Sequence, residues 1–440
     1  MNFSAEYKSF LDKLNSIRIS AGIRLGLDRI RELLEKLGRP QDSFKSIVVS
    51  GTNGKGSVVA MLSNVLKSAG YKVGSYISPH LYDIRERISI NSCWIDKASF
   101  LRIGKRVLKM AEDMHDPPSF YEVMTAIGFE YFREKRVDIG VLEIGLGGRL
   151  DAVNIVDPVH CVITTVDYDH EGYLGSTLTD IAKEKAGIVK RGVTVVLGDQ
   201  KEEVVKVAES ICSEREAYLY RKGRDFDFSI VRVGEIIEKG QTMDFVSGNI
   251  LLKDLEIGLR GEYQFLNASL VVESALILDR KGVRVSERSI RSGVKSVKWK
   301  GRFDVRQIRD KIVIFDGAHN PHGAKALASS LKLFLPREKI CFVFGVMRDK
   351  NYKKMLESLS SVASSFVFTS VGTERALPTQ DLLKAGNLIL RGKDVALDGN
   401  EDPLRALEMA FSRPEKIICV CGSLYLVGKI LAFLERNSES

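Results

Sequence analysis

The residues best suited to chemistry lie in a glycine-rich stretch, Ser50–Ser57, which reads Ser-Gly-Thr-Asn-Gly-Lys-Gly-Ser. Glycines let the backbone approach a polyanion closely, and the first N–H groups of a following helix point toward the same place. Lys55 supplies a positive charge for outer phosphates, and the hydroxyl of Ser57 can hold Mg²⁺. Gly56 separates these two residues, so the spacing departs from the common G-x-x-x-x-G-K-S/T pattern. Such a stretch can be only a turn, but Lys and Ser between a strand and a helix favour a nucleotide-binding loop.

Polar residues also follow three other predicted strands in the same part of the chain. They are Ser78 after 71–77, Glu143 at the end of 137–144, and His170 after 160–166. In parallel sheets ligands bind at the carboxyl ends of the strands, so these residues and the glycine-rich loop are expected to converge on one crevice. Beside a phosphate loop, Glu143 is predicted to be a Mg²⁺ ligand rather than a salt-bridged carboxylate. His170 alone fits a ligand and a hydrogen-bonded loop histidine equally well.

The elements that must position these residues alternate between strand and helix. Helices are predicted over 4–19, 26–37, 58–69, 96–113, 119–134 and 201–214, and strands over 47–49, 71–77, 137–144, 160–166, 193–198 and 217–221. Such alternation indicates right-handed crossovers and a mostly parallel sheet. Residues 80–91 show no clear periodicity and are expected to form an ordered, charged loop. A helix through Ile181 and Ile188 is expected to contain Lys183, Lys185 and Lys190, for which solvent exposure is the ordinary expectation.

The pattern changes twice in the second half of the chain. Residues 226–260 alternate polar and apolar residues, which indicates a small antiparallel sheet, and helices over 263–280 and 286–297 follow. After a boundary at Trp299–Phe303, strands are predicted over 311–316, 339–345, 366–371, 394–398 and 416–421, with helices over 321–334, 351–363, 378–389, 401–412 and 424–436. We therefore predict an α/β protein. Residues 1–297 would form an ATP-binding domain whose mostly parallel phosphate-loop sheet accompanies the small antiparallel one, and residues 298–440 a second, Rossmann-like domain.

Composition sets broad limits on function. The 440 residues are 44% hydrophobic and 28% charged, which is ordinary for a soluble globular protein of about two or three domains. Six scattered cysteines without a C-x-x-C pair favour buried free thiols, and with no apparent secretory signal or membrane span the cytoplasm is expected. The net charge of +9 is dispersed along the helices, so it favours anionic small molecules over nucleic acid. Basic residues interleaved with aromatic ones, expected of a nucleic-acid-remodelling module, are not found.

Taken together, several long motifs resemble one family. They are Gly51–Ser57, Ser78–Leu81, Glu143–Asp151, Asp169-His170, Lys183–Ile188, Gly301–Phe303, Asp316–Pro321 and Gly422–Leu426. In this order, over about residues 20–430, they resemble folylpolyglutamate synthase, a family of the Mur ligase superfamily that includes bifunctional dihydrofolate synthases. The resemblance implies a magnesium-dependent ligase of folate metabolism that uses ATP to join L-glutamate to the γ-carboxylate of a folate through an acyl phosphate. Whether dihydropteroate is also a substrate is left open.

The resemblance also implies roles for individual residues, with catalysis assigned to Lys55, Glu143, His170 and Lys185. It implies ATP contacts at Gly51, Thr52, Asn53, Gly54, Lys55, Gly56, Ser57, Asn267, Arg302 and Asp316. Two Mg²⁺ ions are expected, one on Ser57 and Glu143 and the other on Ser78, Glu143 and His170, and Lys185 matches a lysine that CO₂ carbamylates. Glutamate contacts are expected at His319 and Ser423, and folate contacts at Pro79, His80, Leu81, Arg87 and Asp151. The protein is expected to be a monomer without nucleic-acid or membrane partners.

Three positions depart from the pattern of the family. Tyr263 stands where His is usual, Lys300 replaces a common Pro, and Asn351 replaces a frequent Asp. None of these is a proposed metal ligand, and their effect on nucleotide binding stays open. An alternative interpretation is another Mur-type ligase, of the cell-wall or cyanophycin kind, but Ser78–Leu81 and Gly422–Tyr425 favour folate.

Overall fold

The computed structural model describes residues 3–21, 24–237 and 240–438. An eight-stranded sheet with the order β4-β3-β2-β5-β1-β6-β7-β8 dominates the first half of the chain. Its strands are β1 (Lys45–Ser50), β2 (Val73–Tyr76), β3 (Ile88–Ile90), β4 (Cys93–Trp94), β5 (Ile139–Glu143), β6 (Pro158–Ile163), β7 (Thr194–Leu197) and β8 (Tyr218–Arg221). The strands from β2 to β8 in this order pair in parallel, whereas β3 and β4 add an antiparallel edge. The predicted mostly parallel sheet is confirmed.

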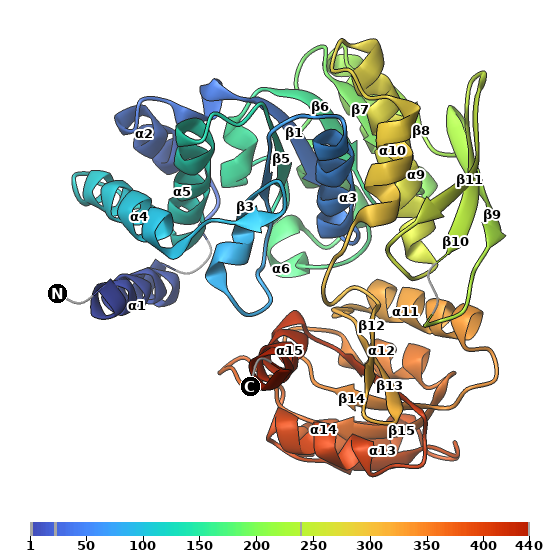
Figure 1. Ribbon diagram of the computed structural model, residues 1–440. Coiled ribbons are helices and arrows are strands. Elements are labelled where there is room, and N and C mark those ends of the chain that lie inside the picture. Colours follow the sequence, from blue (N-terminus) through green and yellow to red (C-terminus); the bar gives the residue numbers. More distant parts are fainter. Residues whose placement is uncertain (1–2, 22–23, 238–239, 439–440) are drawn as a thin grey trace.

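Helices cover both faces of this sheet, which explains why its central strands are continuous hydrophobic runs (Figure 1). In β1, Val48 faces a core beneath α1, α2, α4, α5, α7 and α8, whereas Ile47 and Val49 face α3, α9 and α10. The helices are α1 (Phe3–Ala21), α2 (Asp28–Lys36), α3 (Lys55–Ser68), α4 (Lys97–Glu112), α5 (Phe120–Glu134), α6 (Glu171–Leu174), α7 (Leu178–Ala186), α8 (Glu202–Glu214), α9 (Tyr263–Arg280) and α10 (Glu287–Ser296).

A small antiparallel sheet with the order β11-β10-β9 lies beside α9, as predicted for residues 226–260. Its strands are β9 (Phe226–Arg232), β10 (Gln241–Ser247) and β11 (Ile250–Ile257). The ring of Phe228 stacks on that of Phe265 of α9, with 6.4 Å between ring centroids. Aromatic packing therefore joins this sheet to the core that also supports α3 and the phosphate loop.

A six-stranded sheet with the order β12-β13-β17-β14-β15-β16 forms the second α/β unit. Its strands are β12 (Asp304–Ile308), β13 (Lys311–Phe315), β14 (Ile340–Phe344), β15 (Ala363–Phe368), β16 (Ala396–Gly399) and β17 (Ile417–Cys421). The flanking helices are α11 (Pro321–Phe334), α12 (Tyr352–Leu359), α13 (Thr379–Ile389), α14 (Pro403–Phe411) and α15 (Leu424–Ser438). Only β12 runs antiparallel to its neighbour within this described sheet, so the expected Rossmann-like arrangement is confirmed.

Several predicted details are wrong. Residues 80–91 are not all loop, because a 3₁₀ turn over Ile84–Arg87 leads into β3, which pairs with β2. Helix α7 ends at Ala186, so Lys190 lies beyond it. Strand β12 was missed although Asp304–Ile308 alternates polar and apolar residues; it pairs antiparallel with β13. β15 begins three residues before its predicted start, at small residues that are held by pairing with β14.

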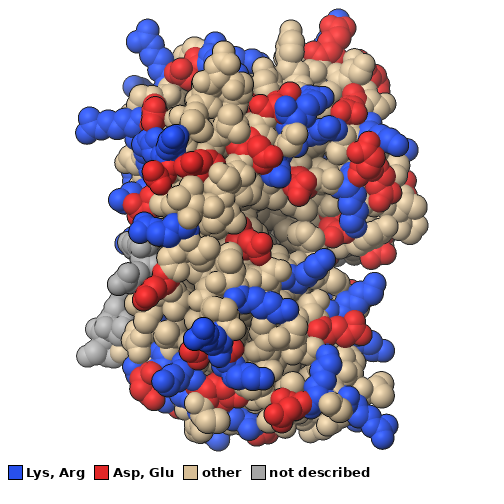
Figure 2. Space-filling view, turned by 90° about the vertical axis from the view of Figure 1, so that its right-hand side faces the viewer, with Lys and Arg blue, Asp and Glu red and all other residues tan. Residues whose placement is uncertain are grey.

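The remaining predictions concern surface and packing. Five of the six cysteines are buried and all six are free, with Cys93 exposed. Lys and Arg are interspersed with Asp and Glu on the face seen in Figure 2, which also shows a hollow between the upper and lower parts of the molecule. No helix among the described residues is long and apolar enough to cross a membrane. The domain ranges 1–297 and 298–440 stay a prediction.

Candidate active site

The phosphate loop joins β1 to α3, and two of its glycines are required by close packing. Gly51 and Gly54 have φ angles of 140° and 93°, which side chains rarely adopt. A Cβ at Gly51 would collide with Thr164, and one at Gly54 with Asn267. Helix α3 begins at Lys55, earlier than predicted, so the free N–H groups of its first turn lie in the loop itself. This geometry is that of an anion-binding helix N-terminus.

One pocket is lined by both halves of the chain. It brings together most of the predicted site residues, namely Gly51, Thr52, Asn53, Gly54, Lys55, Gly56, Ser57, Ser78, Pro79, Glu143, His170, Lys185, Asn267, Arg302, Asp316 and His319. The predicted convergence of the glycine-rich loop, Ser78, Glu143 and His170 is therefore confirmed. Five predicted residues do not line it: His80, Leu81, Arg87, Asp151 and Ser423. The first four were assigned to folate and the last to glutamate, and those roles stay predictions.

Two lysines meet at the phosphate loop, the buried Lys185 and the partly buried Lys55. The Lys55 ammonium donates to the carbonyl oxygens of Gly51 and Thr52 at 3.0 and 3.2 Å, and Lys185 donates to that of Gly51 at 2.8 Å. Burial lowers the pKa of Lys55, although Glu143 opposes the change. Burial, together with the nearby charge of Lys55, lowers the pKa of Lys185 to about 7. Lys185 is only 5% exposed, so the expectation of a solvated helix lysine is wrong and its amine is partly neutral near pH 7.

The oxygen atoms around the loop suit a hard cation. Glu143 Oε2 accepts a hydrogen bond from the Ser78 N–H at 3.1 Å, and burial raises the pKa of this carboxyl group. The hydroxyl of Ser57 accepts from Gln264 Nε2 at 3.2 Å. No group of three or more His, Cys, Asp or Glu side chains that could hold a metal occurs among the described residues. One carboxylate and a hydroxyl nevertheless fit Mg²⁺, because this ion completes its coordination with water and substrate phosphates.

His170 and Asp169 lie where the loop after β6 turns toward the other half of the molecule. His170 has a φ angle of 54° and precedes α6, and burial lowers its pKa to about 4. Its imidazole is therefore neutral at pH 7, the state in which a ring nitrogen can bind a metal. The His170 N–H donates to Asp169 Oδ1 at 2.9 Å, whereas its ring nitrogen Nε2 lies 4.0 Å from the same oxygen.

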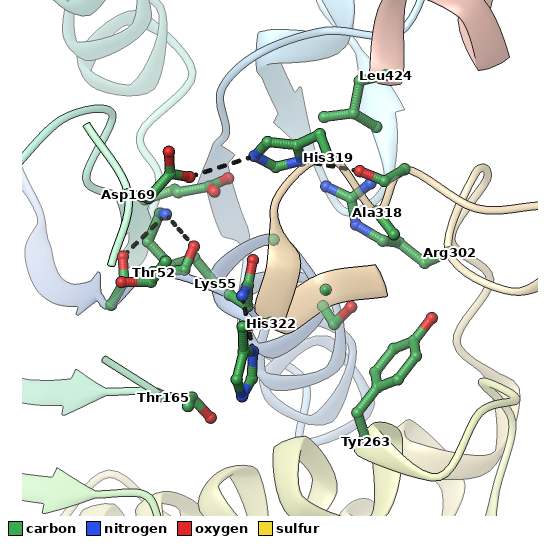
Figure 3. A pocket seen from close by; sticks show the side chains of 18 of the residues that line it. Thr52, Lys55, Thr165, Asp169, Tyr263, Arg302, Ala318, His319, His322 and Leu424 are labelled. Atoms are coloured by element: carbon green, nitrogen blue, oxygen red, sulfur yellow. Dashed lines mark hydrogen bonds and ion pairs between the residues drawn. The ribbon is translucent and has the colours of Figure 1, made fainter. Parts of the chain in front are cut away.

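Asp169 connects the two halves. Its Oδ1 lies 2.6 Å from Lys350 Nζ, and its Oδ2 accepts from Asn320 Nδ2 at 3.0 Å. The imidazole of His319 faces the same carboxylate, with Nε2 at 3.6 Å from Oδ2 (Figure 3). Burial would raise the pKa of Asp169, but the hydrogen bond from His319 and the neighbouring charges lower it below its ordinary value. Lys350 was not among the predicted site residues; its only signal was the position of Asp349-Lys350 after a strand.

On the second sheet, Asp316 is occupied by donors of the protein. Oδ2 accepts the Tyr263 hydroxyl at 2.6 Å and the Phe303 N–H at 2.9 Å, and Oδ1 accepts the Ala318 N–H at 2.8 Å. Burial raises the pKa of Asp316. The side chains of Arg302 and Tyr263 both face the pocket, so Tyr263, noted only as a departure, belongs to the site (Figure 3).

The predicted residues outside the pocket have structural partners. Asp151 accepts N–H groups of Gly145, Leu146 and Val153 at 2.9–3.0 Å, and burial raises its pKa to about 6. Ser423 Oγ accepts the Tyr425 N–H at 3.2 Å.

Residues of the 80–91 segment, to which folate contacts were assigned, also have partners within that segment. Arg87 Nε lies 3.0 Å from His80 Nδ1, and burial together with Arg87 lowers the pKa of His80 to about 3. Leu81 packs against the second α/β unit.

Sequence comparison identifies the class to which this arrangement belongs. Residues 49–275 match the Mur ligase middle domain, and residues 301–424 match the Mur ligase, glutamate ligase domain. The chain is thus a Mur ligase. It is 32% identical to the dihydrofolate synthase/folylpolyglutamate synthase of Bacillus subtilis over 94% of this chain and 96% of the relative. The chain belongs to the folylpolyglutamate synthase/dihydrofolate synthase family.

Solved structures agree with this assignment. A crystal structure of folylpolyglutamate synthase from Thermotoga maritima has a TM-score of 0.85 at 37% identity, covering 97% of both chains. A bifunctional folylpolyglutamate synthase/dihydrofolate synthase, solved with Mn, AMPPNP and L-glutamate bound, has a TM-score of 0.84 at 27% identity and covers 98% of both chains.

Proposed function

We propose that this protein is an ATP-dependent ligase that adds L-glutamate to the γ-carboxylate of a folate, releasing ADP and phosphate. The observation that carries the proposal is the single pocket in which the phosphate loop, Glu143 and Lys185 of one sheet face His319 of the other. The names of its relatives support folate as the substrate, and a related bifunctional synthase has been solved with a nucleotide analogue and L-glutamate bound. The alternative of a cell-wall or cyanophycin ligase has no comparable support.

The first step activates the carboxylate, which is otherwise a poor acyl donor. A γ-carboxylate oxygen attacks the γ-phosphorus of ATP, a new O–P bond forms, and the bond to ADP breaks. Phosphoryl transfer depends mainly on positioning and on neutralising charge. The N–H groups at the start of α3 and the Lys55 ammonium would bind the phosphates, and Arg302, which lines the same pocket, adds a positive charge.

The divalent cations of the reaction have matching donors in this chain. Ser57 and Glu143 would hold one Mg²⁺, and Ser78, Glu143 and His170 a second. When bound, these ions neutralise charge that develops on the phosphate and carbonyl oxygens. Glu143 is held in place by the Ser78 N–H, and the His170 imidazole is neutral at pH 7, the form that can bind a metal.

The second step forms the amide. The amine of L-glutamate attacks the acyl carbon, a C–N bond forms, phosphate departs with the C–O bond electrons, and the amine loses a proton. His319, and Ser423 by resemblance, would hold the incoming glutamate. Reacting atoms must approach to roughly 3–3.5 Å, so the two α/β units must close around the substrates. Closure also excludes water, which would hydrolyse the acyl phosphate.

Lys185 would be carbamylated by CO₂ and so become an anion that supports the metal ligands. Its buried amine and its pKa of about 7 support this, because carbamylation needs a neutral amine. We also propose that the protein works in the cytoplasm, where its six free thiols would stay reduced, and as a monomer, as the family resemblance implies.

Phosphate release measured with purified protein tests the function. We expect release to require ATP, Mg²⁺, a folate and L-glutamate together, and to be unaffected by polynucleotides. Comparing tetrahydrofolate with dihydropteroate then separates folylpolyglutamate synthase from dihydrofolate synthase activity. Phosphate release that proceeds at full rate without a folate or a pteroate contradicts the proposal.

A further inference from the structure

The loop that follows β2 makes contact with both halves of the molecule. Ser78 and Pro79 line the pocket, but the chain then leaves it, and Leu81 and Tyr82 pack against the core of the second α/β unit. Figure 1 shows this blue loop beside the red helix α15. A Cβ at Gly428 of α15 would collide with the backbone of Leu81, so the loop and the helix meet at backbone distance.

Three segments distant in sequence meet at the hydroxyl of Tyr82. Tyr82 donates to Glu435 Oε2 at 2.7 Å, and Lys300 Nζ donates to the Tyr82 oxygen at 2.9 Å. Lys300 also donates to Glu435 Oε2 at 2.9 Å and lies 5.4 Å from the centroid of the Tyr82 ring. Arg306 binds the other carboxylate oxygen of Glu435 at 3.3 Å. We call Tyr82, Lys300 and Glu435 the interdomain clamp.

The loop between the clamp and the pocket is itself rigidly held. The carboxylate of Glu86 accepts the N–H groups of Leu81, Tyr82 and Asp83 at 2.8–3.0 Å. Arg87 binds His80, and its carbonyl oxygen accepts the Ile77 N–H at 3.0 Å. A displacement of Tyr82 is therefore transmitted to Ser78 and Pro79 rather than absorbed between them.

Lys300 gives the clamp its connection to domain movement. It lies between α10 and β12, in the segment that joins the two α/β units, where the family commonly has a proline. A proline offers neither the ammonium group nor a hydrogen-bond donor, so a chain with proline at this position lacks this part of the clamp. We propose that Tyr82 is a positioning residue which, held by Lys300 and Glu435 in the closed arrangement, fixes the 78–87 loop at the substrate pocket.

This proposal rests on the proposed function only for its kinetic consequence. Breaking the clamp is expected to raise KM for the folate, because the loop that borders the pocket loses its position. KM for ATP is expected to change little, because the phosphate loop does not contact the clamp. Net contributions of single hydrogen bonds correspond to roughly 2- to 10-fold in an equilibrium constant, and effects of that size are expected.

Hydrogen exchange of the ligand-free protein provides a test that needs no substrate. In Tyr82→Phe, which keeps the ring and removes the hydroxyl, and in Glu435→Gln and Lys300→Met, amides in residues 78–90 should exchange roughly 2- to 10-fold faster. Tyr218→Phe, at an exposed tyrosine of β8, and Glu408→Gln, at an exposed ion pair with Arg309, are matched controls. The effects of Tyr82→Phe and Glu435→Gln should be less than additive in the double variant, because both substitutions act on the contact between these two side chains.

A second measurement addresses closure directly. With AMPPNP and folate bound, small-angle scattering should show that Tyr82→Phe compacts less than the wild type. Gly428→Ala should compact least, because its methyl group obstructs the docking of the loop on α15. Unchanged exchange in residues 78–90 together with unchanged KM values overturns the clamp. A wild-type protein that releases no phosphate with folate and L-glutamate overturns the proposed function instead, whereas faster exchange in the variants would still support the clamp.

Discussion

Both parallel sheets present their carboxyl ends to the same pocket, but the polar side chains there are held differently. On the eight-stranded sheet, Lys55 and Lys185 touch only backbone oxygens of the loop among the described residues, and Glu143 is held by a backbone N–H. On the six-stranded sheet, the carboxylate of Asp316 accepts three donors of the protein. The proposed reacting groups are thus concentrated on the first sheet, whereas the second unit supplies Arg302 and His319 for substrate binding and a carboxylate that orients its own loops.

The pKa values do not separate the two sheets, because burial also raises the pKa of Asp316. Burial shifts the pKa of Lys55, Glu143 and Lys185 toward the neutral forms, so each of these groups has charge to regain when it meets a phosphate or a metal. Ionisable groups with pKa values perturbed by burial are typical of sites where reaction occurs. The comparison predicts that substitutions on the first sheet affect turnover, and those on the second affect binding and closure.

The largest effect is expected at Glu143. Glu143→Gln keeps the size of the side chain but removes the negative charge shared by both proposed metal sites, so kcat should fall more than about 100-fold. Steady-state phosphate release at saturating Mg²⁺ is the measurement. Glu273→Gln, which changes a buried carboxyl group of α9 that does not line the pocket, serves as the control. A near-normal kcat in Glu143→Gln would contradict the assignment of the reaction chemistry to the first sheet.

A somewhat smaller loss, about 100-fold at most, is expected for Lys185→Ala, and short carboxylates should restore part of the activity. Lys183→Ala is the control, because Lys183 is exposed on the same helix.

The pH dependence at Lys185 has a definite sign. Because the pKa of Lys185 is about 7, its amine is protonated below that pH and cannot add CO₂. Wild-type enzyme depleted of CO₂ should therefore regain activity on addition of bicarbonate at pH 8 but much less at pH 6. Equal recovery at both values contradicts carbamylation.

The ion pair that joins the two sheets should give the next effect. Asp169→Asn removes the charge of the closer of the two carboxylates beside Lys350, at a position where the side chains of Asp169 and Lys350 are 9% and 11% exposed. Truncating one member of a buried pair disfavours the arrangement that contains it, so kcat/KM for L-glutamate should fall at least about tenfold. Asp398→Asn, at a half-exposed surface pair with Arg413, should be nearly silent. A fall in kcat with unchanged closure by scattering would place Asp169 with the chemical residues.

The sequence could predict contacts within one sheet but not those between the two sheets. Buried β-branched strands followed by glycine or a carboxylate located the phosphate loop and Glu143, because strand-end residues of one parallel sheet must lie together. Lys185 could be chosen only by resemblance, since nothing local distinguishes it from Lys183. Two features depend on how the two separate sheets are placed. They are the contact of Asp169 with Lys350 and the packing of Leu81 against the second α/β unit. Local sequence patterns do not encode that placement.

The smallest effect is expected at Tyr263, the position where the family usually has histidine. Its hydroxyl donates to Asp316 at 2.6 Å, and the same carboxylate oxygen accepts the Phe303 N–H just after the segment joining the two units. Tyr263→Phe removes one of three donors and leaves the buried carboxylate paired with two backbone N–H groups. The loss should be about 1 kcal/mol, which is roughly fivefold in KM for ATP, with kcat nearly unchanged. Asp316 would still be anchored in this variant, so a large fall in kcat would mean that Asp316 acts on the substrate itself. The contrast between a reacting first sheet and an orienting second sheet would then fail at Asp316.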